Sequence, residues 1–484
     1  MKKNLTLTLI VCMMLGTAAI CPAQTKPGPK AKPGQSGFPG FGGFQEEPAP
    51  WIEKGYDDYQ NMMDRLGIKS LRPGKSGSNQ TGPGFEEATA NEWMPTMPDA
   101  LVMKDGTKVA TPQQWNRRRA EILEDFEREV YGRIPVSVPE VNWEITETTK
   151  GETEGIPTIT RKLVGHVDNS GFREITVDIQ ASFTVPANTP VPVPLFLQFG
   201  FGGGMFAGMG GGASQQAIRH GWGFGTIVPN SIQADRGGNA LRQGIIGLAN
   251  KGKPRKPEDW GALRAWSWGV SKLIDYFEAN PDMKVEPEKV SIEGVSRYGK
   301  AALVTQAFDT RVAVALVASS GEGGAKLHRH DFGEAVENLT GSGEYHWMCG
   351  NFLKYGASDI KGRSMDASDI PVDSHELIAL CAPRPCFISY GVEPGDPKWV
   401  DAPGSYRAGI LASKVYKVLG KKGYGYDIED WIHAPLPPVG TLVGGDLAFR
   451  QHEGGHTSGP NIPIFFEWIG DYIKSPFVPS VPAR

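Results

Sequence analysis

The sequence predicts an α/β domain in which helices cover both faces of a mostly parallel sheet. Three observations support this fold class. Apolar runs of strand length alternate with helix-length segments from about residue 190 to residue 475. Three segments of alternating apolar and polar residues precede them, as expected for antiparallel strands at a sheet edge. Near residue 290, a β-prone run leads through a glycine and a serine directly into a helix-forming segment.

The first part of the chain has the features of an export signal, followed by those of a flexible tether. Two lysines and an apolar run at residues 5–20 form the charged and apolar regions of a signal peptide over residues 1–24. This run is short for a membrane span, so we expect a secreted or periplasmic protein with no membrane contact beyond the export signal. Residues 25–92 are rich in Pro and Gly and predict a tether that is partly ordered at most, with one helix near residues 57–66. The catalytic domain is then expected over residues 93–484.

The remaining elements follow in order. Thr111 and Pro112 provide an N-cap and a favourable first helical residue for a helix over residues 112–131. Antiparallel strands are expected at residues 141–148, 158–167 and 174–183, and buried strands at 193–199, 223–228, 290–292, 311–317, 386–390 and 447–451. Further helices are expected at residues 260–280, 300–308 and 463–472.

The composition limits the kinds of partner and the number of disulfides that the chain can have. The chain has 484 residues and a net charge of −4, from 50 basic and 54 acidic residues. No basic stripe is present, so we expect no nucleic-acid partner. Two of the five cysteines fall in the leader, which leaves Cys349, Cys381 and Cys386 and room for one disulfide at most. The sequence does not determine their pairing.

The strand, turn and helix around Ser296 match a nucleophile elbow. Gly294 precedes the serine, and the serine would stand at a helix N-terminus, where backbone N–H groups stabilise negative charge. The match to G-x-S-x-G is imperfect, because Tyr298 occupies the second glycine position and Gly299 comes one residue later. A strand–helix turn with a solvated serine is the alternative. With the alternating elements, the elbow indicates an α/β-hydrolase, a three-layer sandwich with a mostly parallel central sheet.

The chain order of this fold places the acid and then the base after the nucleophile. The base is expected after the last strand, where His456 is favoured over His452 because it lies beyond a Gly pair on the side that can reach the serine. The acid is expected after residues 386–390. Asp396 lies deep enough in that loop to reach a histidine, Glu393 lies nearer the strand end, and Asp401 is better placed to cap the next helix.

Several motifs resemble the glucuronoyl esterases, carbohydrate esterase family 15. The elbow Gly-Val-Ser-Arg-Tyr-Gly-Lys at residues 294–300 is similar to that family's Gly-Cys-Ser-Arg-x-Gly-Lys, which accounts for the displaced glycine. Other matches are Ala-Trp-Ser-Trp-Gly at 265–269, Ser-Gly-Glu-Gly-Gly at 320–324, Phe-Gly-Glu at 332–334, His-Trp at 346–347, the segment 373–385 and Gly-His at 455–456. They run in order from the helix before the elbow to the final histidine, cover most of the region from about residue 190 to residue 475, and include none of the first 90 residues.

The resemblance implies a function and a set of site residues. It implies hydrolysis of an ester of (4-O-methyl-)glucuronic acid, as in the linkage between lignin and glucuronoxylan. It makes Ser296 the nucleophile, His456 the general base and Arg297 the oxyanion-hole residue. Lys300 and Glu334 would hold sugar hydroxyls, and Trp399 would form a wall beside the sugar ring.

The position of the acid departs from part of the family. Some members carry it directly after the strand that follows the elbow helix, where this chain has Ala318-Ser319-Ser320 and the nearby Glu322 comes too late. The sequence therefore favours Asp396, as in other members, with Glu393 as the alternative. The loop is one residue longer than the usual Asp-x-Trp, because Pro397 and Lys398 both intervene before Trp399.

Two other functions compete with this prediction. One is a carbohydrate esterase of other specificity, such as an acetyl xylan esterase, and the other is a non-catalytic carbohydrate-binding protein on the same fold. The mechanism needs no cofactor and no metal, and no Cys/His spacing resembles a zinc site. We expect a monomer whose partner is glucuronoxylan or another uronate ester. The preferred alcohol and the length of xylan bound are not determined by the sequence.

Overall fold

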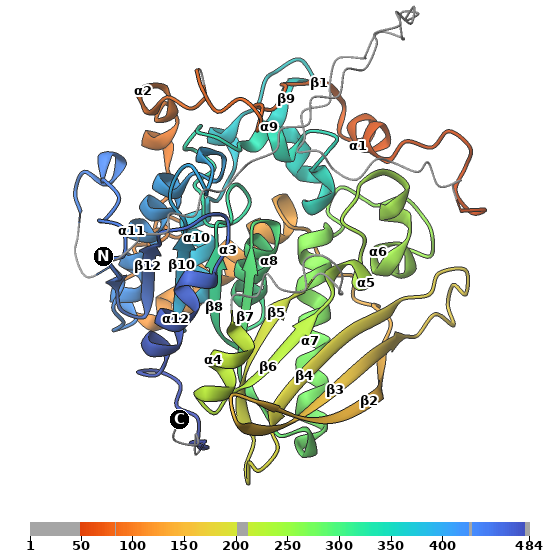
Figure 1. The fold of residues 1–484 in the computed structure, drawn as a ribbon. Helices are drawn as coiled ribbons and strands as arrows, with labels where there is room; N and C mark the ends of the chain where they lie inside the picture. Colours follow the sequence, from red (N-terminus) through yellow and green to blue (C-terminus); the bar gives the residue numbers. More distant parts are fainter. Residues whose placement is uncertain (1–48, 83, 201–211, 425–427, 480–484) are drawn as a thin grey trace, which may run out of the picture. The chain divides into compact units, whose positions relative to one another are not determined.

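A computed structural model describes residues 49–82, 84–200, 212–424 and 428–479 (Figure 1). The predicted signal peptide at residues 1–24, and residues 25–48 of the predicted tether, lie outside the described residues. In the described ranges, no helix has the length and apolar character needed to cross a membrane.

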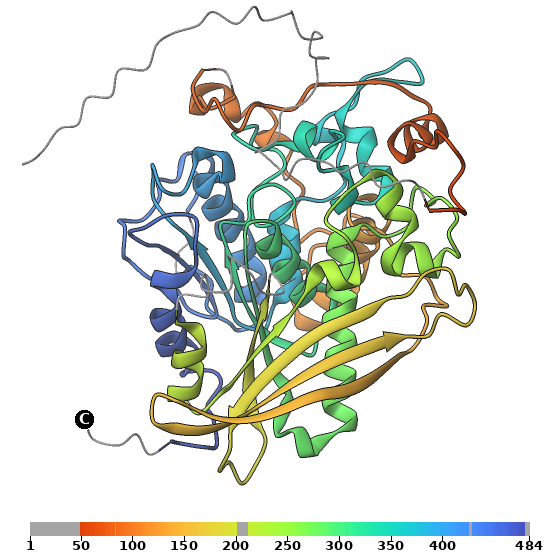
Figure 2. The ribbon, with the colours of Figure 1, turned by 45° about the vertical axis from the view of Figure 1, so that its right-hand side comes forward.

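A ten-stranded sheet in the order β11-β12-β10-β8-β7-β5-β6-β4-β3-β2 is the central layer (Figure 1). Neighbouring strands from β12 to β6 pair in parallel, and the pairs at both edges are antiparallel. Figure 2 shows the long strands of the antiparallel edge, coloured orange and yellow, curving away from the parallel part. The strands are β2 (Val141–Thr153), β3 (Ile156–Val167), β4 (Asp178–Pro186), β5 (Val193–Phe199), β6 (Gly223–Ile227), β7 (Val285–Val295), β8 (Val312–Ala318), β10 (Cys386–Tyr390), β11 (Val443–Gly444) and β12 (Leu447–Gln451).

Helices cover both faces of this sheet, which confirms the predicted three-layer sandwich. Strand β8 has the alternation of a strand buried on both faces: Ala315 and Val317 belong to the larger core, and Val314 and Leu316 belong to the second core. Helices α3 (Pro112–Glu129), α7 (Ala262–Ala279), α8 (Arg297–Phe308), α10 (Ser374–Cys381) and α11 (Ala402–Val418) pack in the layer of the larger core. Helices α4 (Ala213–Arg219) and α12 (Ile462–Ile469) cover the second core.

The local predictions agree with the observed elements except at some ends. Helix α3 begins as expected, because the Thr111 side chain accepts from the Gln114 N–H and Pro112 opens the first turn. Asp401 caps α11 by accepting from the Gly404 N–H at 2.9 Å, as the sequence indicated. The third antiparallel strand was expected from residue 174, but β4 begins at Asp178. Residues 168–177 instead form the connection from β3.

The predicted boundary near residue 93 is wrong, because residues 49–92 already pack against the rest of the domain. Helix α1 (Asp58–Leu66) begins at the N-cap Asp57 and ends at Gly67, which has a φ of 72°. Strand β1 (Ile68–Leu71) pairs antiparallel with β9 (Ala357–Ile360). Met62 and Ile68 are buried in the larger core. The Pro and Gly content of the segment masked these few buried apolar residues, and the described residues from 49 onward belong to one compact unit.

Candidate active site

A sharp turn between β7 and α8 carries Ser296. Its φ of 62° and ψ of −128° lie in a strained region for a residue with a side chain. A Cβ atom on Gly294 would lie 2.2 Å from the Tyr298 carbonyl oxygen, and one on Gly299 would lie 2.5 Å from Ala318 O. Both positions therefore require glycine. The displaced second glycine of the motif has a steric reason, namely the close approach of α8 to the end of β8.

The turn places Ser296 half-buried at the N-terminus of α8, with its side chain not used to cap the helix. The first backbone N–H groups of a helix have no partner inside the helix and favour nearby negative charge. Strands β12, β10, β8 and β7 are parallel neighbours, so the loops that follow them lie at one edge of the sheet. Those loops hold His456, Asp396, Ser319 and Ser296, respectively.

His456 and Asp396 form a hydrogen-bonded pair in this set of loops. His456 Nδ1–H donates to Asp396 Oδ1 at 2.7 Å. Asp396 is buried, with 2 % of its side chain exposed, whereas the His456 side chain is 34 % exposed. A histidine bonded through Nδ1 to a carboxylate presents Nε2 for proton transfer. The structure therefore brings together the histidine and the carboxylate that the sequence favoured.

The alternative residues have other partners. His452 lies buried at the end of β12, where its Nε2–H donates to Thr457 O at 2.8 Å within the loop. Glu393 is exposed, and its carboxylate lies 4.0 Å from Lys398 Nζ. These contacts assign His452 a loop-stabilising role and leave Glu393 at the surface.

Asp235 connects Arg297 to an aromatic side chain. Asp235 Oδ2 accepts from Arg297 Nη1 at 2.7 Å, and Oδ1 accepts from Trp347 Nε1 at 2.7 Å and from His346 Nε2 at 2.9 Å. The guanidinium carbon of Arg297 lies 5.2 Å from the Trp347 ring centroid, within the range of a cation–π contact. Burial opposes ionisation of Asp235, but the His346 hydrogen bond and the Arg297 charge hold its pKa well below the usual range. This carboxylate thus fixes the direction of Arg297.

Lys300 and Glu334 form a buried ion pair one helical turn from Ser296. Lys300 Nζ donates to Glu334 Oε2 at 2.7 Å and to Ser320 O at 2.6 Å, and lies 5.5 Å from the Trp347 ring centroid. The Glu334 backbone N–H donates to Trp399 O at 2.8 Å. Trp399 itself is 9 % exposed. The three residues that the resemblance assigned to the sugar are therefore neighbours in the structure.

Sequence reasoning missed Asp235, Trp347 and Glu344. Glu344 is half-buried beside this cluster, and its Oε2 is buried with no hydrogen-bond partner among the described residues. Burial and the Glu334 charge raise the pKa of Glu344 to about 8. The His-Trp pair at 346–347 could have revealed Trp347, because this motif matched the family although neither residue had been given a function. Asp235 was harder to identify, because the sequence shows only that an acidic residue lies in the loops after the parallel strand β6.

The described ranges contain no group of three or more His, Cys, Asp or Glu side chains arranged to hold a metal ion. Three pairs of charged or titratable groups instead form the site: His456 with Asp396, Arg297 with Asp235, and Lys300 with Glu334. The arrangement offers a hydroxyl at a helix N-terminus, an imidazole oriented by a carboxylate, and a fixed guanidinium. This combination supports nucleophilic attack on a carbonyl group and stabilisation of the resulting oxyanion.

Comparison with known proteins agrees with this chemistry. The family model for fungal glucuronyl esterases matches residues 255–420. The carbohydrate esterase MZ0003, from an unknown prokaryotic organism, is 33% identical over 411 residues, which cover 78% of this chain and 88% of that protein. A 4-O-methyl-glucuronoyl methylesterase from Wolfiporia cocos is 27% identical over 347 residues, which cover 68% of this chain and 73% of the relative.

Comparison with solved structures also indicates similarity to glucuronoyl esterases. A glucuronoyl esterase of carbohydrate esterase family 15 from Teredinibacter turnerae matches with a TM-score of 0.77 and 37% identity, over 86% of this chain and 98% of that structure. The match extends beyond the elbow and covers nearly the whole solved chain, which confirms the predicted α/β-hydrolase fold and the predicted resemblance. The chain belongs to the glucuronoyl esterases, carbohydrate esterase family 15.

Proposed function

We propose that the protein is a serine esterase that hydrolyses esters of (4-O-methyl-)glucuronic acid, as found where lignin is bound to glucuronoxylan. The observation that carries this proposal is the position of Ser296, Arg297 and Lys300 on one helix start, with Lys300 paired to Glu334. A reactive hydroxyl, an oxyanion donor and one sugar-binding group thereby lie within one helical turn, and Lys300 brings Glu334 beside them. The relatives named above, which include glucuronoyl esterases, support the same substrate class.

The reaction begins with attack on the uronoyl carbonyl carbon. Nε2 of His456 accepts the Ser296 proton while the serine oxygen bonds to that carbon. Asp396 holds the imidazole through Nδ1 and stabilises the imidazolium that forms. The buried position of Asp396 strengthens this interaction, because little water screens it.

Negative charge then develops on the carbonyl oxygen. Arg297 and the backbone N–H groups at the start of α8 stabilise it, and the pair with Asp235 holds the guanidinium in place before the reaction. The alcohol leaves with the proton that His456 carries. A water molecule activated by the same histidine then hydrolyses the ester between Ser296 and the uronic acid.

The sugar is held by groups that do not react. Lys300 donates to two protein oxygens and retains a third N–H for a sugar hydroxyl, while Glu334 offers carboxylate lone pairs. Burial and the Glu334 charge raise the pKa of Glu344 to about 8, which favours its protonated form beside these groups at neutral pH. Trp347 and Trp399 supply apolar surface around these groups.

Variants of the triad test the proposal. Ser296→Ala is expected to abolish hydrolysis of benzyl and methyl glucuronate with an unchanged circular dichroism spectrum, and retained activity would remove Ser296 from the mechanism. Asp396→Asn is expected to lower kcat strongly, whereas the exposed Glu393→Gln serves as its matched control. Equal effects of the two carboxylate variants would show that the acid is misplaced. Acetylated xylose, assayed in parallel, distinguishes an acetyl esterase.

Export and a monomeric state complete the proposal. The polymeric substrate lies outside the cell, so the charged and apolar start of the chain fits a signal that directs secretion or periplasmic release. N-terminal sequencing of protein recovered outside the cytoplasm tests this, with a start near residue 25 as the supporting result. Size-exclusion chromatography with light scattering tests the monomer, and a mass near twice that of the mature chain would contradict it.

A further inference from the structure

The turn that follows β8 contacts both halves of the candidate site. The first residue of the turn, Ser319, donates through Oγ to Asp396 Oδ2 at 2.5 Å. Three residues later, the Glu322 N–H donates to Glu334 Oε2 at 2.9 Å. The carbonyl oxygen of Ser320, between them, accepts from Lys300. One short segment therefore connects the carboxylate that orients the histidine to the ion pair assigned to the sugar.

Ser319 helps to fix the orientation of Asp396. Oδ2 of Asp396 accepts from Ser319 Oγ and from the Gly391 N–H at 2.7 Å, which leaves Oδ1 directed to His456 Nδ1. Ser319 is fully buried, and its backbone N–H donates to Ser389 O of β10 at 2.8 Å. Its φ of 42° lies in the left-handed region, which disfavours residues with side chains. A serine at this strained position is explained by the bond that its hydroxyl makes.

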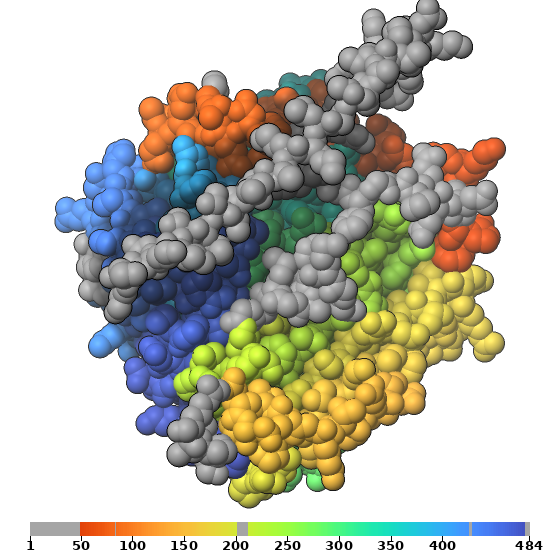
Figure 3. All heavy atoms as spheres, viewed as in Figure 1, coloured from red at the N-terminus to blue at the C-terminus, as the bar shows by residue number. Residues whose placement is uncertain are grey.

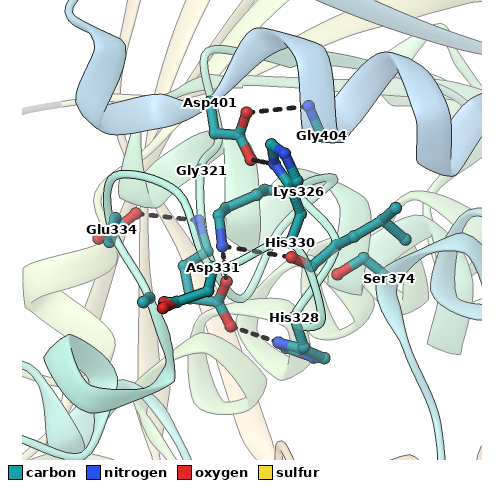
Figure 4. Close-up of polar contacts among 12 residues, drawn as sticks. Gly321, Lys326, His328, His330, Asp331, Glu334, Ser374, Asp401 and Gly404 are labelled. Atoms are coloured by element: carbon teal, nitrogen blue, oxygen red, sulfur yellow. Dashed lines mark hydrogen bonds and ion pairs between the residues drawn. The ribbon is translucent and has the colours of Figure 1, made fainter. Parts of the chain in front are cut away.

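A buried charged cluster holds the turn in place. The Glu322 carboxylate accepts from Lys326 Nζ at 2.7 Å and from His328 Nδ1, and all three side chains are fully buried. Burial opposes the ionisation of Glu322, but Lys326 and His328 hold its pKa at about 2. Figure 4 shows Lys326 and His328 on the loop beside Glu334, which bonds back to the turn. None of these three groups takes part in the proposed reaction, and together they make the turn rigid.

We propose that Ser319 is a positioning residue for catalysis that keeps Asp396 aligned with His456. This inference rests on the proposed roles of Asp396 and His456. Without the Ser319 hydroxyl, Asp396 Oδ2 keeps the Gly391 N–H alone, and the carboxylate gains freedom to rotate away from the imidazole. A carboxylate that turns away from the imidazole stabilises the protonated histidine less strongly.

Ser319→Gly is the decisive variant, because glycine adopts a φ of 42° without strain and the fold is therefore retained. We expect kcat on benzyl glucuronate to fall by about 10-fold, the effect of losing one hydrogen bond to a charged group, with KM unchanged. The acidic limb of the pH profile of kcat/KM is expected to move to lower pH, because the protonated histidine is less stabilised. Ser319→Cys keeps a side chain of the same connectivity, slightly larger, that donates only weakly, and it should change both quantities in the same direction.

A serine in the neighbouring strand provides the matched control. Ser291 is also fully buried, and its Oγ donates to the backbone oxygen of Leu195 at 3.1 Å in the core. Ser291→Ala should keep the wild-type kcat and the wild-type acidic limb in the pH profile of kcat/KM. A folded Ser319→Gly protein with wild-type kcat and pH limb would overturn the inference, while an inactive Ser296→Ala protein would still support the proposed function. Conversely, an active Ser296→Ala protein would defeat the proposed function itself.

Discussion

Asp235→Asn tests whether a carboxylate outside the triad controls the oxyanion site. Asparagine has nearly the same shape and retains an oxygen that accepts from Trp347 and His346. It loses the charge that holds Arg297 Nη1 at 2.7 Å. The variant therefore separates the orientation of the guanidinium from the packing of the wall behind it.

The magnitude follows from the bond that is lost. A hydrogen bond to a charged group contributes about 1.5–3 kcal/mol, which corresponds to about 10- to 150-fold in rate if it acts fully in the transition state. The Arg297 side chain is 43 % exposed, so the pair contributes about 1 kcal/mol or less to folding. We expect kcat on benzyl glucuronate to fall by about 10- to 50-fold, with little change in KM or in the melting temperature.

The assay needs a double-mutant cycle and a matched control. If Asp235 acts through Arg297, adding Asp235→Asn to Arg297→Met should cause little further loss. Asp275→Asn makes the same chemical change at another pair, where Asp275 Oδ1 lies 2.7 Å from Arg311 Nη1 outside the site, and should leave kcat unchanged. Fully additive losses in the cycle, or wild-type kcat for Asp235→Asn, would refute the reasoning.

Three further variants test separate features. Gly294→Ala places a Cβ 2.2 Å from the Tyr298 carbonyl oxygen, so we expect a lower melting temperature and loss of esterase activity; an active, stable variant would contradict the steric argument. Glu322→Gln removes the carboxylate that is bonded to the buried Lys326 and should cost about 3–5 kcal/mol in urea unfolding, whereas a cost below about 1 kcal/mol would contradict that pairing. The pKa of Glu344 is raised from 4.5 to about 8, so its stabilising contribution is greatest below pH 4.5 and is lost as the pH rises through 8. The melting temperature of Glu344→Gln, relative to wild type, should therefore rise between pH 6 and pH 9; a constant difference would count against the buried, protonated carboxyl.

The sequence was sufficient where local pattern decides the structure. The alternation of apolar runs predicted the central strands, and β10 and β12 have the expected ends. Thr111 and Asp401 cap their helices as their positions indicated. The spacing of His456 and Asp396 within their loops also predicted the pair that forms, because parallel strands bring successive loops to one edge.

The remaining features depend on tertiary contacts that have no local pattern. Asp235 acquires its role from residues more than 60 positions away, and Ser319 acquires its role from a loop 77 positions away. The ordering of residues 49–92 was missed for the same reason. A Pro- and Gly-rich segment has low local preference for structure, and a few buried side chains with long-range backbone pairing suffice to fix it.

The N-terminal segment also determines how far the protein can be shortened at its N-terminus without disturbing the site. The Gln80 side-chain oxygen accepts from the Trp399 N–H at 3.1 Å, and the Gly84 carbonyl accepts from the Gly333 N–H, next to Glu334. Figure 3 shows this orange segment lying against blue residues of the C-terminal half. Recombinant protein begun at residue 93 would lack the backbone partners of both sugar-side loops. An affinity tag or an added binding module should therefore be fused ahead of residue 49, and a protease used to remove it must spare the stretch that follows.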